Sequence, residues 1–303
     1  MPRSSDQEAC LAILARGSKS FALAGRLLPR RVLEPTAALY AFCRVSDDRI
    51  DEAPRPAAGL AEVMRRIELL YAGRPADDPV DRAFAQVIET HRLPRPVLEA
   101  LAEGFLWDVE RRRYRDLDAL VDYAARVAST VGVLLTLILG ERRPSMLARA
   151  ADLGVAMQLT NIARDVGEDA RNGRLYLPID SMRQAGLDPE RFLAEPRFSP
   201  ALGAVVEGVL DAAEPLYQRA ELGLVGLPRS VRFGLGAAGA FYRGIGARIR
   251  RARLDTVSTR RWVPLGTKLW LASTALPLLF RSGDGGTAPA LRQTQFLVEA
   301  SRG

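Results

Sequence analysis

The stretch "QLTNIARDVGEDARNGRLYLP", from Gln158 to Pro178, carries oxygen-bearing side chains at a repeated spacing. Asn161, Asp165 and Asp169 follow one another at intervals of four residues, and Glu168 lies three residues after Asp165. Residues three or four apart share one face of an α-helix. The stretch therefore predicts a helix that presents one amide and three carboxylates along a single stripe.

The residues around this stripe also favour a helix. Val155, Leu159 and Ile162 give it an apolar side, and "RNG" at 171–173 is a suitable C-terminal stop. Carboxylates in the last turns lie near the negative end of the helix dipole, which is unfavourable for them. A positive group is therefore expected beside the stripe.

A second acidic cluster lies in "LYAFCRVSDDRIDE", from residue 39 to residue 52. Asp47 and Asp51 are four apart and share a helical face, with Asp48 beside them. Like charges at this spacing destabilise a helix by roughly 0.2–0.5 kcal/mol per pair. A helix gains nothing from this arrangement unless a cation is bound nearby.

Two kinds of cation would compensate these acids. The first is the set of neighbouring arginines, Arg44, Arg49, Arg164 and Arg171. The second is a divalent metal, which two clusters and the neutral oxygen of Asn161 favour, because amide oxygens suit hard cations and add nothing to a salt bridge. Mg²⁺ fits best, since it uses few carboxylates and completes its shell with water and phosphates. Zinc is disfavoured, because the only histidine, His91, lies away from both clusters.

Composition limits the other possibilities. The 303 residues are 48% hydrophobic and 26% charged, as in an ordinary folded chain. The net charge of +7 indicates an anionic partner, which could be nucleic acid, a membrane surface or a phosphorylated substrate. The basic clusters, "ERRRYR" at 110–115 and "RIRRAR" at 248–253, contain acids or alternate with apolar residues and match no nucleic-acid-binding motif, so nucleic acid is not expected as a partner.

Apolar residues recur at spacings of three and four, while alternating patterns are scarce. The sequence therefore predicts an all-α fold, with Pro and Gly separating segments of helical length. No segment resembles a domain linker. We expect one domain over residues 1–280 and a flexible C-terminal tail over residues 281–303.

Two features bear on the location of the protein. Cys10 and Cys43 form neither a disulfide framework nor a CxxC pair, and the first residues lack the apolar core of a signal peptide, so we expect the cytoplasm. The most apolar run, "WVPLGTKLWLASTALPLLF" at 262–280, is interrupted by prolines and a lysine and is too broken to span a membrane. It could be a buried helix, or a peripheral membrane contact anchored by its tryptophans and by Arg260, Arg261 and Lys268.

The acidic stretches closely resemble those of the squalene/phytoene synthase family, in its bacterial phytoene-synthase branch. The resemblance covers most of the chain and includes "GSKSF" at 17–21, "LYAFCRVSDDRID" at 39–51, "ASTVG" at 128–132 and "AMQLTNIARDVGEDARNGRLYLP" at 156–178. It implies a terpenoid synthase fold, a single helical bundle around a central cavity. It also implies that both stripes hold Mg²⁺, with Mn²⁺ as a substitute, against a substrate diphosphate.

The resemblance implies a specific reaction. Two geranylgeranyl diphosphates condense head to head through a cyclopropyl diphosphate to phytoene, a step of carotenoid biosynthesis, without NADPH. The implied metal ligands are Asp47, Asp48, Asp51, Asn161, Asp165, Glu168 and Asp169. The implied catalytic residues are Tyr40, Tyr176, Arg44 and Arg164, and the implied substrate contacts are Ser18, Ser20, Arg44, Gln158, Arg164, Arg174 and Tyr242. Asp108 matches a family acid but is left out of the metal set.

Two rival functions remain open. A C30 synthase would use farnesyl diphosphate to make presqualene diphosphate, dehydrosqualene or squalene. A non-catalytic, membrane-associated assembly factor would bind pathway enzymes and would not need both acidic stripes. Pathway enzymes are possible partners of a synthase as well.

Overall fold

The computed structural model describes residues 4–17, 19–25, 27–281, 283 and 286–302. These residues form helices joined by turns and contain no β-strand, which confirms the predicted all-α class. The α-helices are α1 (Ser5–Gly17), α2 (Lys19–Gly25), α3 (Arg30–Asp51), α4 (Pro56–Tyr71), α5 (Pro79–His91), α6 (Arg95–Val109), α7 (Leu117–Ala124), α8 (Thr130–Ile138), α9 (Pro144–Arg171), α10 (Ile179–Gln184), α11 (Pro189–Ala194), α12 (Pro200–Gly226), α13 (Arg229–Arg251), α14 (Leu265–Ser273) and α15 (Gln295–Ala300). A π-helical turn η1 (Ala125–Ser129) and two 3₁₀ turns, η2 (Leu276–Leu279) and η3 (Arg292–Thr294), complete the set.

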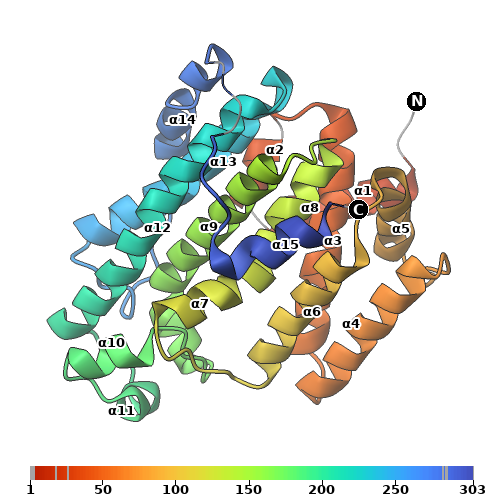
Figure 1. Cartoon of the computed structure of the whole chain (residues 1–303). Helices are drawn as coiled ribbons and strands as arrows, with labels where there is room; N and C mark the ends of the chain where they lie inside the picture. The colour runs from red at the N-terminus through yellow and green to blue at the C-terminus, as the bar shows by residue number, and fades with distance from the viewer. Residues whose placement is uncertain (1–3, 18, 26, 282, 284–285, 303) are drawn as a thin grey trace.

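Helix α9 is the longest and lies in the middle of the bundle (Figure 1). It packs against α12 and α13 on one side and against η1 and α8 on the other. The buried residues divide into two main clusters. One gathers α1, α3, α4, α5, α6 and α8 around Phe42 and Leu134, and the other gathers α7, α9, α12 and α13 around Leu159 and Tyr217. The N-terminal half of α9 belongs to the first cluster and its C-terminal half to the second.

Local sequence explains where several helices begin. The side chains of Asp78, Asp116, Asp188 and Ser199 accept hydrogen bonds from backbone N–H groups in the first turns of α5, α7, α11 and α12. Such N-caps satisfy donors that have no partner within the helix. Proline occupies the start of α4, α5, α6, α9, α11 and α12, where its missing N–H costs nothing.

Helices α7 and α8 form one continuous apolar rod through the π-turn η1. Leu117–Ile138 is the one stretch in the described part of the chain that is long and apolar enough to cross a membrane, and 61% of its most apolar window is buried inside the bundle. A Cβ atom on Gly154 would lie 2.6 Å from the Cα atom of Ser129, so glycine lets α9 approach η1 closely. The rod is therefore a wall of the bundle core.

The C-terminal region differs from the expected flexible tail. Residues 292–300 form η3 and α15, which packs against α6, α8 and α9 and buries Leu297 and Val298 in the first core cluster. Arg149 and Arg219 both donate hydrogen bonds to the backbone oxygen of Pro289, at 3.2 and 2.7 Å. The expectation of a flexible tail is thus wrong for these residues, because they pack against the bundle. The sequence did not reveal this, since a six-residue helix is too short to show an apolar period.

Candidate active site

The two acidic stripes lie on α3 and α9 and face a common cavity of about 360 Å³. Asp47 and Asp51 line it from α3, and Asn161 and Asp165 line it from α9. The other lining residues include Arg44, Asp108, Tyr123, Gln158, Arg164, Arg174 and Tyr176. The structure therefore brings Asp47, Asp51, Asn161 and Asp165 to one site, which we call the acidic cavity. The other predicted metal ligands, Asp48, Glu168 and Asp169, lie on the same two helices but are not among its lining residues.

Arginines pair with several of these acids. Arg44 donates to Asp48 at 2.5 and 3.1 Å, and Arg164 donates to Asp165 at 2.5 and 2.8 Å. Arg174 donates to Asp51 at 2.7 Å, which joins the loop after α9 to the end of α3. The two other arginines that the sequence offered as partners contact different groups, because Arg49 pairs with Glu62 and Asp78, and Arg171 donates to the backbone oxygen of Val257.

Arg260 is a component of the site that the sequence did not reveal. Its guanidinium lies 2.8 Å from Asp165 and 3.1 Å from Glu168. The preceding segment reaches α9 because Gly167 leaves room, since a Cβ atom there would lie 2.4 Å from the backbone oxygen of Val257. The Gly167 N–H also donates to the backbone oxygen of Thr256 at 3.2 Å. Arg260, which the sequence offers as one anchor of a possible membrane contact, thus pairs with acids of the α9 stripe.

Asp47 and Asp169 form no ion pair with an arginine within the part of the chain that the structure describes. Burial, followed by the negative charge of Asp108, raises the pKa of Asp47 to about 7. Burial, followed by the negative charge of Asp165, raises the pKa of Asp169 to about 7. Burial is the larger cause in both cases and a neighbouring carboxylate adds to it, so a bound cation would stabilise the charged form of both groups.

The donor set fits a hard divalent cation. Asn161 Oδ1 is shielded from solvent and has no hydrogen-bond partner, while its Nδ2 donates to Gln158 at 3.4 Å. A buried amide oxygen without a partner, beside carboxylates of raised pKa, is the chemistry that Mg²⁺ prefers. Across the described residues, no three carboxylate, histidine or cysteine side chains converge on one point that could hold an ion. Binding a metal would therefore require some carboxylates to exchange their arginine partners.

Asp108, on α6, lines the acidic cavity beside three tyrosines. Tyr176 donates to it at 2.6 Å and Tyr123 at 2.9 Å, and Tyr114 stacks against both rings at 5.1–6.2 Å between centroids. Burial nevertheless raises the pKa of Asp108. Tyr123 was not foreseen from the sequence, since nothing in its local pattern distinguishes it from a core residue.

A second cavity of about 350 Å³ continues from the first and shares Cys43, Asp47, Val127, Gln158 and Asn161 with it. We call it the apolar tunnel. Tyr40 and Tyr242 stand near its junction with the acidic cavity, and burial raises the pKa of both phenols. A Cβ atom on Gly17 would lie 2.5 Å from the Tyr40 hydroxyl, which places the "GSKSF" motif beside this junction. Ser18 lies outside the described residues, and the structure does not describe the side chain of Ser20.

The apolar tunnel follows α9 toward its N-terminus. Met157, Leu153, Ala150 and Met146 line it at successive turns beyond Asn161. The fifteen residues from Asn161 to Met146 correspond to about 22 Å of helix. Leu224, Leu227 and Leu235 complete its inner end from α12, α13 and the turn between them.

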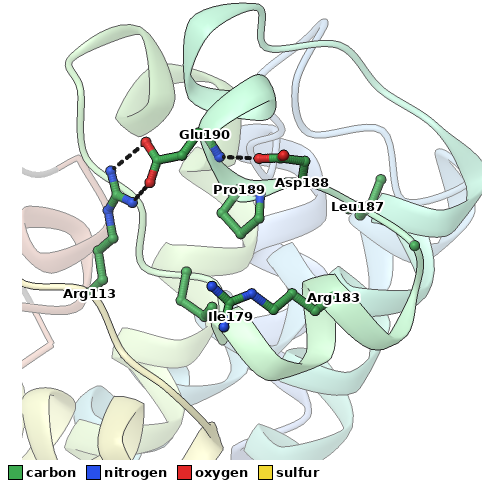
Figure 2. Close-up of a pocket in the computed structure, with 8 residues that line it drawn as sticks. Arg113, Ile179, Arg183, Leu187, Asp188, Pro189 and Glu190 are labelled. Carbon is green, nitrogen blue, oxygen red and sulfur yellow. Dashed lines mark hydrogen bonds and ion pairs between the residues drawn. The ribbon is translucent and has the colours of Figure 1, made fainter.

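A further cavity of about 610 Å³ lies at α10 and α11 and holds none of the predicted site residues (Figure 2). Its rim carries an ion pair between Arg113 and Glu190, and Glu190 N–H donates to Asp188 at 2.8 Å. It has no acidic stripe and no link through shared lining residues to the acidic cavity. The chemistry therefore belongs to the smaller cavity between α3 and α9.

An all-helical bundle with two facing acidic stripes, a ring of arginines and an adjoining apolar tunnel defines a class of proteins that handle prenyl diphosphates. Residues 14–267 match the family model described as squalene/phytoene synthase. The chain belongs to this family and is a prenyltransferase of isoprenoid biosynthesis.

Named relatives and solved structures agree with this assignment. The chain is 48% identical over 273 residues to a phytoene synthase of Rhodobacter capsulatus, covering 89% of this chain and 80% of the relative. It is 41% identical over 282 residues to a 15-cis-phytoene synthase of Paracoccus sp., covering 87% and 91%. Among solved structures, a dehydrosqualene synthase in complex with ligand superimposes with a TM-score of 0.82 at 31% identity, covering 91% of this chain and 96% of the other. A squalene synthase from Alicyclobacillus acidocaldarius superimposes with a TM-score of 0.74 at 25% identity, covering 82% and 94%.

Proposed function

We propose that this chain is a phytoene synthase that joins two molecules of geranylgeranyl diphosphate head to head. The names of its relatives at 41–48% identity support this function. The observation that carries the choice of substrate is the length of the apolar tunnel. An extended isoprene unit is about as long as one helical turn, ~5 Å, so the four turns from Asn161 to Met146 match the four units of a C20 chain.

The tunnel also sets a condition on binding. Two C20 tails need a space at or beyond the upper end of ordinary pockets, roughly 1,000 Å³. The acidic cavity and the apolar tunnel are about 360 and 350 Å³. The second tail therefore requires lining side chains to move, and unbranched Met157 and Met146 suit this because methionine has many accessible rotamers.

Arg44, Arg164 and Arg174 hold the diphosphates in this proposal, since guanidinium groups donate in pairs to phosphate oxygens. Asp47, Asp51, Asn161, Asp165 and Asp169 hold Mg²⁺, or Mn²⁺ in its place, with Asp48 and Glu168 alongside. When bound, the metal supplies positive charge that stabilises a diphosphate leaving group. Arg260 competes with that metal for Asp165 and Glu168, so it moves toward the diphosphate when the site is loaded.

The tyrosines protect the cation formed when diphosphate departs. Tyr40 and Tyr242 present aromatic rings at the tunnel junction, where a ring face stabilises positive charge and excludes water. The Tyr176 hydroxyl keeps its proton directed at Asp108 Oδ1. Burial raises the pKa of both groups, so each holds its proton to a higher pH than it would in water.

We place the enzyme in the cytoplasm, in peripheral contact with a membrane and accessible to pathway enzymes. The two free cysteines support a reducing compartment. Large apolar side chains exposed between residues 262 and 280 support membrane contact.

Product analysis tests the proposal. Purified protein is incubated with Mg²⁺ and either geranylgeranyl or farnesyl diphosphate, without NADPH. Phytoene from the C20 substrate is the expected product. A C30 product instead would assign the enzyme to the class of its dehydrosqualene synthase neighbour. Absence of product and of diphosphate release from both substrates would favour the assembly-factor function.

A further inference from the structure

The segment from Trp262 to Phe280 carries most of the large apolar side chains that face solvent. Of ten such side chains in the described chain, six lie here, and they are between 44% and 83% exposed. These six, which we call the apolar face, are Trp262, Leu265, Leu269, Trp270, Leu276 and Phe280. Helix α14 has no buried residue at all, so the alternative of a buried helix is wrong. Several large apolar side chains left exposed in one segment are typical of a binding surface.

The apolar face is held outward by a firmly packed underside. Leu271 and Leu278 lie so close to α13 that Cβ atoms on Gly244 and Gly236 would come within 2.5 and 2.6 Å of their side chains. Helix α14 lies at the edge of the molecule, outside α13 (Figure 1). The exposed residues are therefore displayed by a docked element.

The charge of the segment suits an anionic surface. Residues 256–283 contain four basic residues, Arg260, Arg261, Lys268 and Arg281, and no acidic residue. Arg260 binds the acids of α9, and Arg281 lies 3.4 Å from Glu221, so the charge is partly compensated within the protein. Tryptophan beside basic residues is characteristic of the lipid–water interface, where the ring enters the headgroup layer and the cation meets anionic lipid.

The position of the apolar face relates it to the tunnel. Ala275 and Leu278, on its underside, belong to the same small core cluster as Met146, Leu224 and Leu227, which line the inner end of the tunnel. The side chains at that end thus form a thin wall between the tunnel and the surface that carries the apolar face. A hydrocarbon product that leaves through this wall would enter lipid directly.

We propose that residues 262–280 seat the protein on an anionic bilayer, with the inner end of the apolar tunnel against the lipid. The docking deepens the peripheral membrane contact of the proposed function, and the exit of product through this end rests on the proposed synthase activity. Docking requires Trp262, Trp270 and Phe280 to enter the interface. The occupant is lipid, so a second copy of the chain or a protein partner at this face would contradict the proposal.

The test uses vesicle co-sedimentation with phosphatidylcholine alone and with added phosphatidylglycerol. We expect the wild type to bind the anionic vesicles and the triple variant Trp262→Ser, Trp270→Ser, Phe280→Ser to lose about tenfold or more in partition coefficient, because each side chain contributes apolar burial. The matched control is Met64→Ser with Leu106→Ser, two apolar side chains exposed elsewhere, which should bind as the wild type does. Unchanged binding by the triple variant, or equal binding to uncharged vesicles, would overturn the proposal.

Three further measurements separate insertion into lipid from adsorption, from loss of catalysis and from dimer formation. Lipids brominated on their acyl chains should quench the fluorescence of Trp262 and Trp270 but leave Trp107, which is buried, unaffected. Absence of quenching would overturn insertion even if vesicles bind. Diphosphate release in detergent micelles should be the same for the triple variant and the wild type. If the proposed catalytic function is wrong, neither protein releases diphosphate. If only the docking is wrong, both proteins still release it. A dimer in solution that the triple variant dissolves would assign the face to a second copy.

Discussion

Asp47 and Asp169 differ from the other aspartates of the two stripes because no arginine in the described chain forms an ion pair with them, and both carboxyls have a pKa of about 7. Asp48, Asp51 and Asp165 are neutralised by arginines that also suit a diphosphate. The residues thus divide into a group already compensated and a group that still needs a cation. In the proposed function, the second group is where Mg²⁺ would bind.

Replacing Asp169 with asparagine should stabilise the metal-free protein at pH 8. A carboxyl whose folded pKa is raised from 3.8 to about 7 binds protons more tightly in the folded state, so stability falls as the pH rises between these values. Asparagine removes that penalty, and we expect a gain on the order of 1–2 kcal/mol at pH 8 and none near pH 4. Thermal unfolding in EDTA at both pH values measures this gain in stability.

In addition, Mg²⁺ should raise the Tm of the wild type more than that of Asp169→Asn, and equal shifts would contradict the metal role.

Gly167 should tolerate no side chain. Its Cβ position lies 2.4 Å from one backbone atom of Val257 and 2.7 Å from another, so Gly167→Ala must displace the segment that carries Arg260. We expect a loss of about 1–3 kcal/mol in stability, together with lower kcat/KM. The matched control is Gly208→Ala, since nothing lies within 4 Å of that Cβ position in α12, and it should stabilise by about 0.5–1 kcal/mol. A Gly167→Ala enzyme as stable and active as the wild type would show that Arg260 is not held by this contact.

At the scale of elements, α9 performs two tasks along one face. Its C-terminal half presents Asn161 and Asp165 to the acidic cavity, and its N-terminal half lines the apolar tunnel with Leu153 and Ala150. Because a helix is straight and has a fixed rise, the distance from the diphosphate to the tunnel end is set by the number of residues between them. Chain-length selection is therefore a property of this helix.

Ala150→Phe should shift the preferred substrate from C20 to C15. Ala150 lines the tunnel about three turns beyond Asn161, so a phenyl ring there would block the space for the fourth isoprene unit. We expect kcat/KM for geranylgeranyl diphosphate to fall at least tenfold relative to farnesyl diphosphate, measured by competition between the two substrates. Ala57→Phe, at an exposed position of α4, is the control for adding a phenyl ring. An unchanged substrate ratio would mean that the tail takes another path.

The elements that could be predicted from the sequence are those whose evidence is local. The spacing of four in Asp47 and Asp51 and in Asn161 and Asp165 was sufficient to predict two helical stripes, because residues one turn apart in sequence are neighbours in space. Arg260 contacts Asp165 across 95 residues, and no short-range pattern records such a contact. Tyr123 and the helix α15 were missed for the same reason, since each derives its role from packing against distant helices.

At the scale of the whole molecule, the C-terminal segment holds the bundle together. Arg149 and Arg219 converge on Asp152 at 2.8 and 3.0 Å and also donate to Pro289, so a buried ionic cluster joins α9, α12 and the chain before α15. Leu297 and Val298 then cover the core formed by α6, α8 and α9. The wall of the tunnel and the C-terminal residues therefore depend on each other.

Leu297→Ala should be strongly destabilising. The side chain is fully buried, and large-to-small substitutions in a core cost about 2–5 kcal/mol. Glu299→Ala, two residues away and exposed, should change stability by no more than about 0.5 kcal/mol. Urea unfolding of both variants measures the difference. Equal stabilities of the two variants would instead support the original expectation that residues 292–300 belong to a flexible tail.

The place of α15 in the chain has a consequence for synthesis on the ribosome. The helices α6, α8 and α9, against which α15 packs, are made before it, so the apolar surface that Leu297 and Val298 cover stays exposed until about residue 300 has emerged. Apolar surface exposed for that period is a target for chaperones and for aggregation. The yield of folded enzyme should therefore depend on how quickly residues 264–303 are translated, even though none of the residues of the two acidic stripes lies among them.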